Sequence, residues 1–186
     1  MLAVINACGN GELDASPVVV ISNNRDAGAL EIARNHSIPA QHISQLTEPD
    51  PAKLDNKIAD TLSNFQVDLV ILAGYMKKIG PITLKRFRHR ILNIHPSLLP
   101  EFGGPGMYGM HVHEAVIAAA AKTSGATVHL VEGDYDVGRI LCQEQVPVYT
   151  GDSPESLAAR VLEVEHRLYV ETLKKVISGE IQLADV

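Results

Sequence analysis

The chain has 186 residues, of which 46% are hydrophobic, and it carries a formal charge of −6 with only two cysteines. This size and apolar content are typical of a single globular domain, which we expect to span residues 1–186. The acidic charge argues against a nucleic-acid partner, the cysteines are too few for a disulfide framework, and no apolar run approaches the ~20 residues of a membrane span. We therefore expect a cytoplasmic protein that binds neither nucleic acid nor membrane.

Segments of strand and helix character alternate along the chain. The periodicity predicts, in order, a strand at 17–22, helices at 26–35 and 51–65, a strand at 67–74, a helix at 81–87, a strand at 91–95, a helix at 111–121, a strand at 126–131 and a helix at 153–177. This alternation predicts an α/β fold with a doubly wound, mostly parallel, Rossmann-like sheet and helices on both faces. Ligands of such sheets bind at the carboxyl ends of the strands, so we expect the site there.

The strand at 91–95 ends in polar residues, within the octapeptide Asn-Ile-His-Pro-Ser-Leu-Leu-Pro at 93–100. Side chains alternate between the faces of a strand, so Asn93 and His95 share a face and lie roughly 7 Å apart. An amide donor beside a titratable ring can polarise a carbonyl and move a proton. The same spacing is also typical of a polar strand end whose histidine caps a turn, and the spacing alone leaves both interpretations open.

The octapeptide at 93–100 resembles the active-site strand of the folate-dependent formyltransferases. Other segments that resemble this family, in order and at similar spacing, are 69–76, 125–131, 134–138, 151–153 and 164–166. The resemblance extends from near residue 1 to about residue 178. It implies the formyltransferase fold for the whole chain.

The amino end departs from the family pattern. The family begins with a strand and a glycine-rich loop that holds the substrate phosphate, whereas Met1 to Cys8 resembles the helix that follows this loop. The glycines of Gly9-Asn10-Gly11 come after this segment and are typical of a helix end. We therefore expect the first strand and the phosphate loop to be absent, through a truncated or mis-started chain, with the fold retained.

The resemblance implies transfer of a formyl group from the cosubstrate 10-formyltetrahydrofolate to the amine of glycinamide ribonucleotide, in purine (IMP) biosynthesis and without a metal. It implies that Asn93 donates a hydrogen bond to the oxygen of the tetrahedral intermediate and that His95 moves a proton. Asp136 would hold the imidazolium or a bridging water. We expect direct transfer, because neither cysteine falls in a matched motif.

The choice of Asp136 over Asp134 rests on its place before Val137-Gly138. Either carboxylate could otherwise belong to a turn. The family commonly has two glycines after this aspartate, and Val137 replaces the first, which restricts the backbone at this point.

The resemblance also implies the contacts with both substrates. For the folate they are Leu72, Tyr75, Met76, Lys77, Ile79, Leu84, Leu92, Val131, Glu132, Gly133, Asp134 and Gly138. For the nucleotide they are Pro96, Ser97, His129 and Glu165. The apolar members would equally suit a plain core, Lys77 would equally suit a solvated surface, and a lone strand histidine such as His129 is often structural.

Glu165 is also distinctive on its own helix. One face of that helix is charged and carries Arg160, Glu163, Arg167, Glu171 and Lys174. The opposite stripe is apolar and comprises Ala158, Leu162, Tyr169 and Leu173, with Glu165 among them. A carboxylate in an apolar stripe is costly unless it is paired or hydrogen-bonded. A buried ion pair and a hydrogen bond to the ribose hydroxyls remain alternatives.

Two further clusters contain residue types that are common in binding sites. His111 and His113, with Asp134 and Asp136, have metal-ligating side chains, but residues two apart in a helix point about 200° apart, so we expect no metal. The glycines at 103–106 do not follow a strand at the spacing of a P-loop, and we expect a mobile loop over the nucleotide.

Three rival functions share the same fold. A formyltetrahydrofolate hydrolase would use water as the nucleophile, and a methionyl-tRNA formyltransferase would need a basic RNA-binding extension. A non-catalytic folate-binding remnant would bind without turnover. The sequence leaves monomer and homodimer open.

Overall fold

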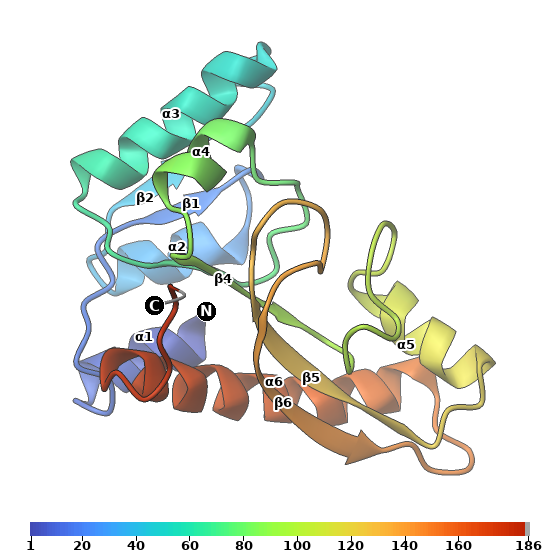
Figure 1. The fold of residues 1–186 in the computed structure, drawn as a ribbon. Helices are drawn as coiled ribbons and strands as arrows, with labels where there is room; N and C mark the ends of the chain where they lie inside the picture. The colour runs from blue at the N-terminus through green and yellow to red at the C-terminus, as the bar shows by residue number, and fades with distance from the viewer. Residues whose placement is uncertain (185–186) are drawn as a thin grey trace.

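A computed structural model of the chain describes residues 1–184 (Figure 1). The elements, in chain order, are α1 (Leu2–Gly9), β1 (Val20–Ser22), α2 (Gly28–Asn35), β2 (Ala40–His42), α3 (Pro51–Asn64), β3 (Val70–Leu72), α4 (Pro81–Arg86), β4 (Ile91–His95), α5 (Met110–Ala118), β5 (Thr123–Leu130), β6 (Ile140–Pro147) and α6 (Pro154–Ile177). None of the helices in this described part has the length and apolar character needed to cross a membrane.

Every strand and helix expected from the periodicity is present, with bounds shifted by a few residues. The segment from Met1 to Cys8 is helical, as expected. Two strands were missed, β2 and β6. β2 has only three residues, and the centre of β6 reads Cys-Gln-Glu-Gln, so neither shows the apolar run or β-branched content that marks a strand in sequence.

The strands form two sheets. β1 pairs with β2 in parallel, and a four-stranded sheet has the order β3-β4-β5-β6. The α/β fold class is confirmed, but the larger sheet is more mixed than expected, since β3 and β4 are parallel whereas β4–β5 and β5–β6 are antiparallel. β5 and β6 are joined by a loop without a helix, and a connection of this kind returns the chain in the opposite direction.

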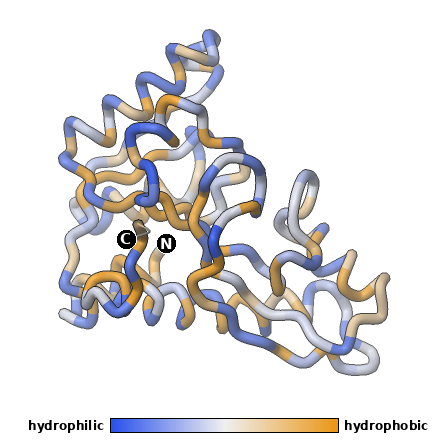
Figure 2. The backbone as a smooth tube through the Cα atoms, viewed as in Figure 1, coloured by the Kyte–Doolittle hydropathy of each residue, from blue (hydrophilic) through white to orange (hydrophobic). Residues whose placement is uncertain are grey.

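Both faces of the larger sheet are covered. On one face, Leu92 and Val128 pack with Leu168 and other residues of α6 and α1. On the other face, Ile91 packs with Leu62 of α3 and with Phe87, which follows α4. Figure 2 shows the apolar stretches concentrated along the strands and the inner sides of the helices. The neighbours Ile91 and Leu92 therefore join different cores, as the alternation of strand side chains requires.

α6 is the longest helix and runs along β5 and β6 (Figure 1). Its start is set by a capping box between Ser153 and Ser156, with Pro154 in the first turn. The expected apolar stripe was wrong for Leu162, whose side chain is 48% exposed. The buried face contains Val161 in place of Leu162 and includes the expected Tyr169; each lies four residues from Glu165, so Glu165 does lie on the buried side.

Candidate active site

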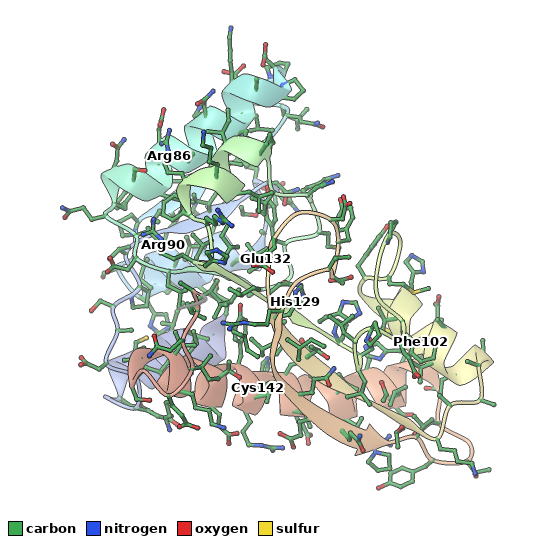
Figure 3. The ribbon with its side chains drawn as sticks, in the orientation of Figure 1. Arg86, Arg90, Phe102, His129, Glu132 and Cys142 are labelled. Carbon is green, nitrogen blue, oxygen red and sulfur yellow. The ribbon has the colours of Figure 1, made fainter. Side chains whose placement is uncertain are left out.

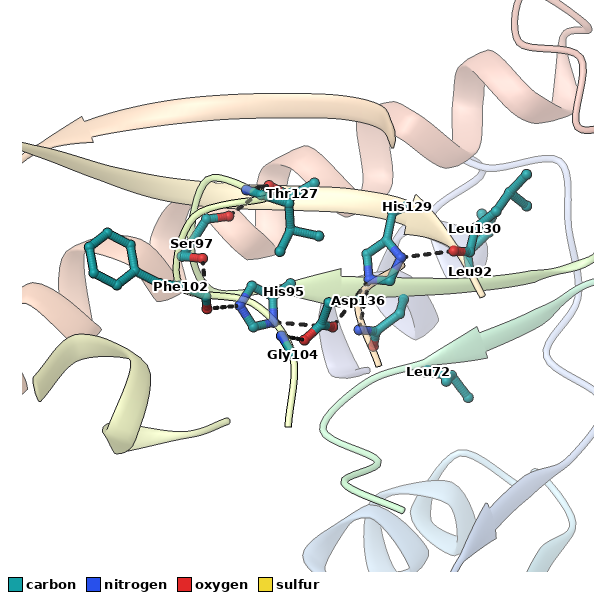
Figure 4. A network of polar contacts seen from close by, with 12 residues as sticks. Leu72, Leu92, His95, Ser97, Phe102, Gly104, Thr127, His129, Leu130 and Asp136 are labelled. Carbon is teal, nitrogen blue, oxygen red and sulfur yellow. Dashed lines mark hydrogen bonds and ion pairs between the residues drawn. The ribbon is translucent and has the colours of Figure 1, made fainter. Parts of the chain in front are cut away.

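Four polar side chains share one face of the sheet at the carboxyl end of β4, and three of them, His95, Thr127 and His129, are labelled in Figure 4. Asn93 pairs with His129 across the β4–β5 ladder, and His95 pairs with Thr127. Residues that are directly opposite in a ladder point to the same face, so the two strands place these four side chains together. The pairing depends on β5 running antiparallel to β4, which the sequence did not reveal.

Asp136 enters this cluster from the loop after β5. Its Oδ1 lies 3.4 Å from His95 Nδ1 and 3.6 Å from His129 Nε2, and its Oδ2 accepts a hydrogen bond of 3.0 Å from the Gly104 N–H. Burial raises the pKa of Asp136, but the two histidines and the Gly104 N–H more than offset this, so the pKa lies well below its usual range. Asp136 therefore stays ionised between the two rings.

The backbone of the Asp136 loop accommodates Val137. The left-handed conformation falls at Asp136 itself, with φ of 56°, and Val137 is outside that region. Aspartate tolerates this conformation better than a β-branched residue does. Gly138 has a different requirement, since a Cβ atom there would lie 1.9 Å from the Leu130 oxygen. The glycine at 138 is therefore needed for close approach of the returning chain.

The ring of His95 is buried and held from both sides. Its Nε2 donates to the backbone oxygen of Phe102 at 2.8 Å, while Nδ1 faces Asp136. Both ring nitrogens thus face oxygen acceptors, which suits a ring that takes up and releases a proton. The sequence could not predict the contacts of the Phe102 oxygen and the Gly104 N–H, because every residue has such backbone groups. Only the glycines at 103–106 marked this loop.

His129 orients Asn93. Its Nδ1 lies 2.8 Å from the Leu130 oxygen, to which it donates, and its Nε2 lies 3.2 Å from Asn93 Nδ2. When the His129 ring is neutral, its Nε2 accepts a hydrogen bond from the Asn93 amide. When the ring is protonated, the proton on Nε2 points at Asp136. His129 is fully buried and reaches Asn93 and Asp136 together.

Glu165 reaches the same region from α6. Burial raises its pKa to about 7, although the nearby His95 and the Met1 amino group lower it. Its carboxyl group has no hydrogen-bond partner among residues 1–184 and is not in an ion pair there, so the buried ion pair is not observed. One turn further along α6, the Tyr169 hydroxyl lies 3.1 Å from the Leu72 oxygen and 3.0 Å from the Leu92 oxygen, which ties the helix to β3 and β4.

Several predicted folate contacts gather in one apolar cluster on the same face as Ile91. The cluster contains Leu72, Tyr75, Ile79, Leu84 and Val131. Leu92 does not belong to it, because its side chain points through the sheet into the opposite core and is fully buried. The predicted folate contact at Leu92 stays a prediction, and the buried side chain leaves only backbone groups to make it.

The remaining predicted folate contacts lie at the rim. Met76 is 52% exposed, and a Cβ atom on Gly109 would lie 3.7 Å from its Cε. Lys77 is exposed, and both Tyr75 and Lys77 also border a cavity of about 720 Å³ between α3 and the loop after β3.

The loop after β5 carries three more of these predicted residues. Glu132 contacts His89 at 3.2 Å on the side of Arg90, away from Phe102 (Figure 3). Asp134 forms an ion pair of 2.5 Å with Lys78, which links this loop to the loop after β3. Gly133 lies between them with a positive φ. Glu132 and Asp134 therefore place their side chains at the protein surface, and the contacts with the folate that the resemblance implies stay predictions.

Of the four predicted nucleotide contacts, three lie at the site and one is buried away from it. His129 and Glu165 lie in or beside the cluster, and Pro96 follows His95 directly. Ser97 is fully buried, and its hydroxyl donates to the Glu101 oxygen at 3.0 Å. The turn at Pro96 directs the Ser97 side chain inward, so its hydroxyl is already used within the loop, and its contact with the nucleotide stays a prediction.

His111 and His113 diverge, as the helix geometry predicted. His111 is exposed beside Glu114, whereas His113 is buried. Burial, with a contribution from His95, lowers the pKa of His113. His113 is thus a neighbour of the site that the sequence did not indicate, because its approach depends on how α5 packs.

Several known proteins are similar to this chain. Residues 1–173 match the formyl transferase family. The chain is 43% identical over 176 residues to the chloroplastic phosphoribosylglycinamide formyltransferase of Arabidopsis thaliana, covering 94% of this chain and 60% of the plant protein. It is 37% identical over 182 residues to phosphoribosylglycinamide formyltransferase of Haemophilus influenzae, covering 98% of this chain and 84% of that protein.

A solved structure shows the same fold. Glycinamide ribonucleotide transformylase 1 from Symbiobacterium toebii superposes with a TM-score of 0.89 at 38% identity, covering 95% of this chain and 81% of that one. The chain therefore spans less than two thirds of the plant relative but most of the bacterial ones. These matches show that the chain belongs to the formyl transferase family, in which its relatives are phosphoribosylglycinamide formyltransferases.

Proposed function

We propose that this chain transfers a formyl group from 10-formyltetrahydrofolate to the amine of glycinamide ribonucleotide, as a step of purine biosynthesis. The observation that carries the proposal is the cluster of Asn93, His95 and Asp136 at the carboxyl end of β4. The relatives, which are phosphoribosylglycinamide formyltransferases, support the same reaction.

In the proposed reaction the substrate amine attacks the formyl carbon, and negative charge develops on the former carbonyl oxygen. Asn93 stabilises that charge by donating an amide N–H, and its contact with His129 holds the amide in place. His95 accepts a proton from the attacking nitrogen and delivers one to the leaving folate nitrogen. Asp136, ionised and 3.4 Å from His95 Nδ1, stabilises the protonated ring.

The two substrates would lie on opposite sides of the polar cluster of Asn93, His95 and Asp136. We propose that the folate ring packs against the apolar cluster of Leu72, Ile79, Leu84 and Val131, because three of these residues, all but Ile79, are only partly buried and Val131 adjoins the Asp136 loop. The nucleotide would lie towards Glu165, whose carboxyl group is free to accept hydrogen bonds from ribose hydroxyls. We propose no metal, since the reaction as written needs no Lewis acid.

Three properties stay predictions. A cytoplasmic location rests on composition, and the Arabidopsis relative is named chloroplastic. A single domain rests on the size of the chain, and the choice between a monomer and a homodimer stays open.

The experiment that tests the function is an absorbance assay for tetrahydrofolate released from 10-formyltetrahydrofolate by the chain of residues 1–186. Release that requires glycinamide ribonucleotide supports the proposal. Release without the nucleotide, accompanied by formate, would assign the hydrolase activity. Folate binding without any release would assign a non-catalytic folate-binding role.

A further inference from the structure

We infer that Thr127 and Gln143 are positioning residues, which hold the loop of residues 97–104 so that its backbone fixes the ring of His95. The inference rests on the proposed function for its kinetic consequences, but the geometry is independent of it. Thr127 and Gln143 are paired directly across the β5–β6 ladder, and therefore lie on the same face as His95.

The Thr127 hydroxyl uses its full hydrogen-bonding capacity on this loop. It donates to the Ser97 oxygen at 2.6 Å and accepts from the Leu99 N–H at 3.0 Å and from Gln143 Nε2 at 2.9 Å. A hydroxyl has one donor and two acceptor positions, so all three are occupied. Thr127 and Ser97 are fully buried, and water cannot easily replace a lost partner there.

Gln143 completes the arrangement from the edge strand. Its Nε2 also donates to the Leu99 oxygen at 2.8 Å, so one amide group contacts both Thr127 and the loop. The rest of the Gln143 side chain is exposed. A substitution at 143 therefore removes two hydrogen bonds without opening a cavity in the core.

The held loop presents two backbone groups to the site. The Ser97 hydroxyl donates to the Glu101 oxygen, and the adjacent Phe102 oxygen accepts from His95 Nε2 at 2.8 Å (Figure 4). Gly104 donates its N–H to Asp136. With Nε2 committed to Phe102, the nitrogen that exchanges a proton during turnover is Nδ1, on the Asp136 side. A displaced loop would release Nε2 and let the ring turn away from Asp136.

The test compares the Thr127→Val and Gln143→Leu variants with wild type. Valine keeps the shape of threonine and removes its hydroxyl. We expect kcat to fall about 10–100-fold with KM for both substrates within about twofold, because displacement of a reacting group by about 1 Å costs this much. Thr127→Ser retains the hydroxyl and should restore kcat. Gln143→Leu should show a smaller fall of the same kind.

Matched controls are available on the same strands. Thr123→Val replaces an exposed threonine on the same face of β5, and Gln145→Leu replaces an exposed glutamine of β6 that has no hydrogen-bond partner in the described chain, residues 1–184. Both should behave as wild type.

A second readout does not depend on activity. The ¹⁵N NMR signals of His95 report which ring nitrogen carries the proton, and the Nε2–H signature should be weakened in Thr127→Val and present in Thr127→Ser. An unchanged His95 spectrum with unchanged kcat in Thr127→Val would overturn the inference, and so would equal losses in Thr127→Val and Thr127→Ser. If Thr127→Val does not fold, the same criteria apply to Gln143→Leu. An inactive wild-type chain with the expected spectra would refute the proposed function and leave the positioning role supported.

Discussion

His95 Nδ1 lies 3.4 Å from Asp136 Oδ1, although the two residues are 41 positions apart and belong to a strand and a loop. The loop after β5 brings the carboxylate to the ring, and the left-handed backbone at Asp136 aims it. This pair is the centre of the proposed proton transfer, and the predictions below follow from it and its neighbours.

Replacing His95 with alanine should lower turnover far more than folate affinity. The ring contacts Asp136 and Phe102 and takes no part in the apolar cluster proposed for the folate. General acid–base catalysis typically contributes about 10²–10⁴-fold, so we expect kcat to fall within that range with a folate Kd near that of wild type. Steady-state kinetics and a folate titration measure the two quantities. A variant with wild-type turnover would remove His95 from the mechanism.

Replacing Asp136 with asparagine should destabilise the protein in a pH-dependent manner. The depressed pKa means that the ionised carboxylate is favoured in the folded state, so its stabilising contribution is complete above the ordinary carboxyl pKa of about 4 and is lost as the pH falls below it. The difference in free energy of unfolding between wild type and Asp136→Asn should therefore be larger at pH 7 than at pH 3. Denaturant titrations at both values check this, and a constant difference would contradict it.

Replacing Glu165 with glutamine should weaken nucleotide binding and leave folate binding unchanged. The carboxylate is the stronger hydrogen-bond acceptor, and it forms as the pH rises through about 7. Nucleotide affinity of wild type should therefore increase between pH 6 and pH 8, and that increase should be reduced in Glu165→Gln. Calorimetric titrations of both ligands measure this. Loss of folate affinity alone would remove Glu165 from the ribose site.

Although Glu165→Gln should weaken nucleotide binding, it should stabilise the folded protein relative to wild type at neutral and higher pH. A carboxyl group whose pKa is raised from about 4.5 to about 7 on folding destabilises the folded state as the pH rises between these values. The free energy of unfolding of Glu165→Gln minus that of wild type should therefore increase by roughly 2–4 kcal/mol as the pH rises from 4.5 to 8. Unfolding curves at the two pH values test this. If the stability of the variant relative to wild type increased as the pH fell, burial would not be what sets the pKa of Glu165.

Replacing Tyr169 with phenylalanine should lower the free energy of unfolding by about 1–3 kcal/mol, because the Leu72 and Leu92 oxygens lose their donor in a buried site. The aromatic ring stays, so packing in the core is kept. Tyr149→Phe is a matched control, since Tyr149 is exposed. Equal stability of the two variants in denaturant titrations would show that the Tyr169 hydroxyl does not hold α6 to the sheet.

Local patterns were sufficient for much of the fold and part of the site. The apolar periodicity located α2 to α6 and strands β1, β3, β4 and β5, because burial of one face requires a repeat of two or 3.6 residues. The same rule placed Asn93 and His95 on one face and separated His111 from His113. It failed for β2 and β6, which carry little apolar signal, and for the stripe through Leu162.

Other features depend on contacts between distant segments. Nothing local shows that β5 runs antiparallel to β4, yet that pairing brings His129 to Asn93 and Thr127 to His95. The turn that directs the Ser97 side chain inward had no signal in the sequence, whereas the opposite direction of the Leu92 side chain follows from strand alternation itself. The Phe102 oxygen and the Gly104 N–H have no residue-specific signature at all. Residue types along the chain therefore decided which chemistry is available, while the packing of loops and strands decided which atoms meet, since hydrogen bonds act only over about 3 Å.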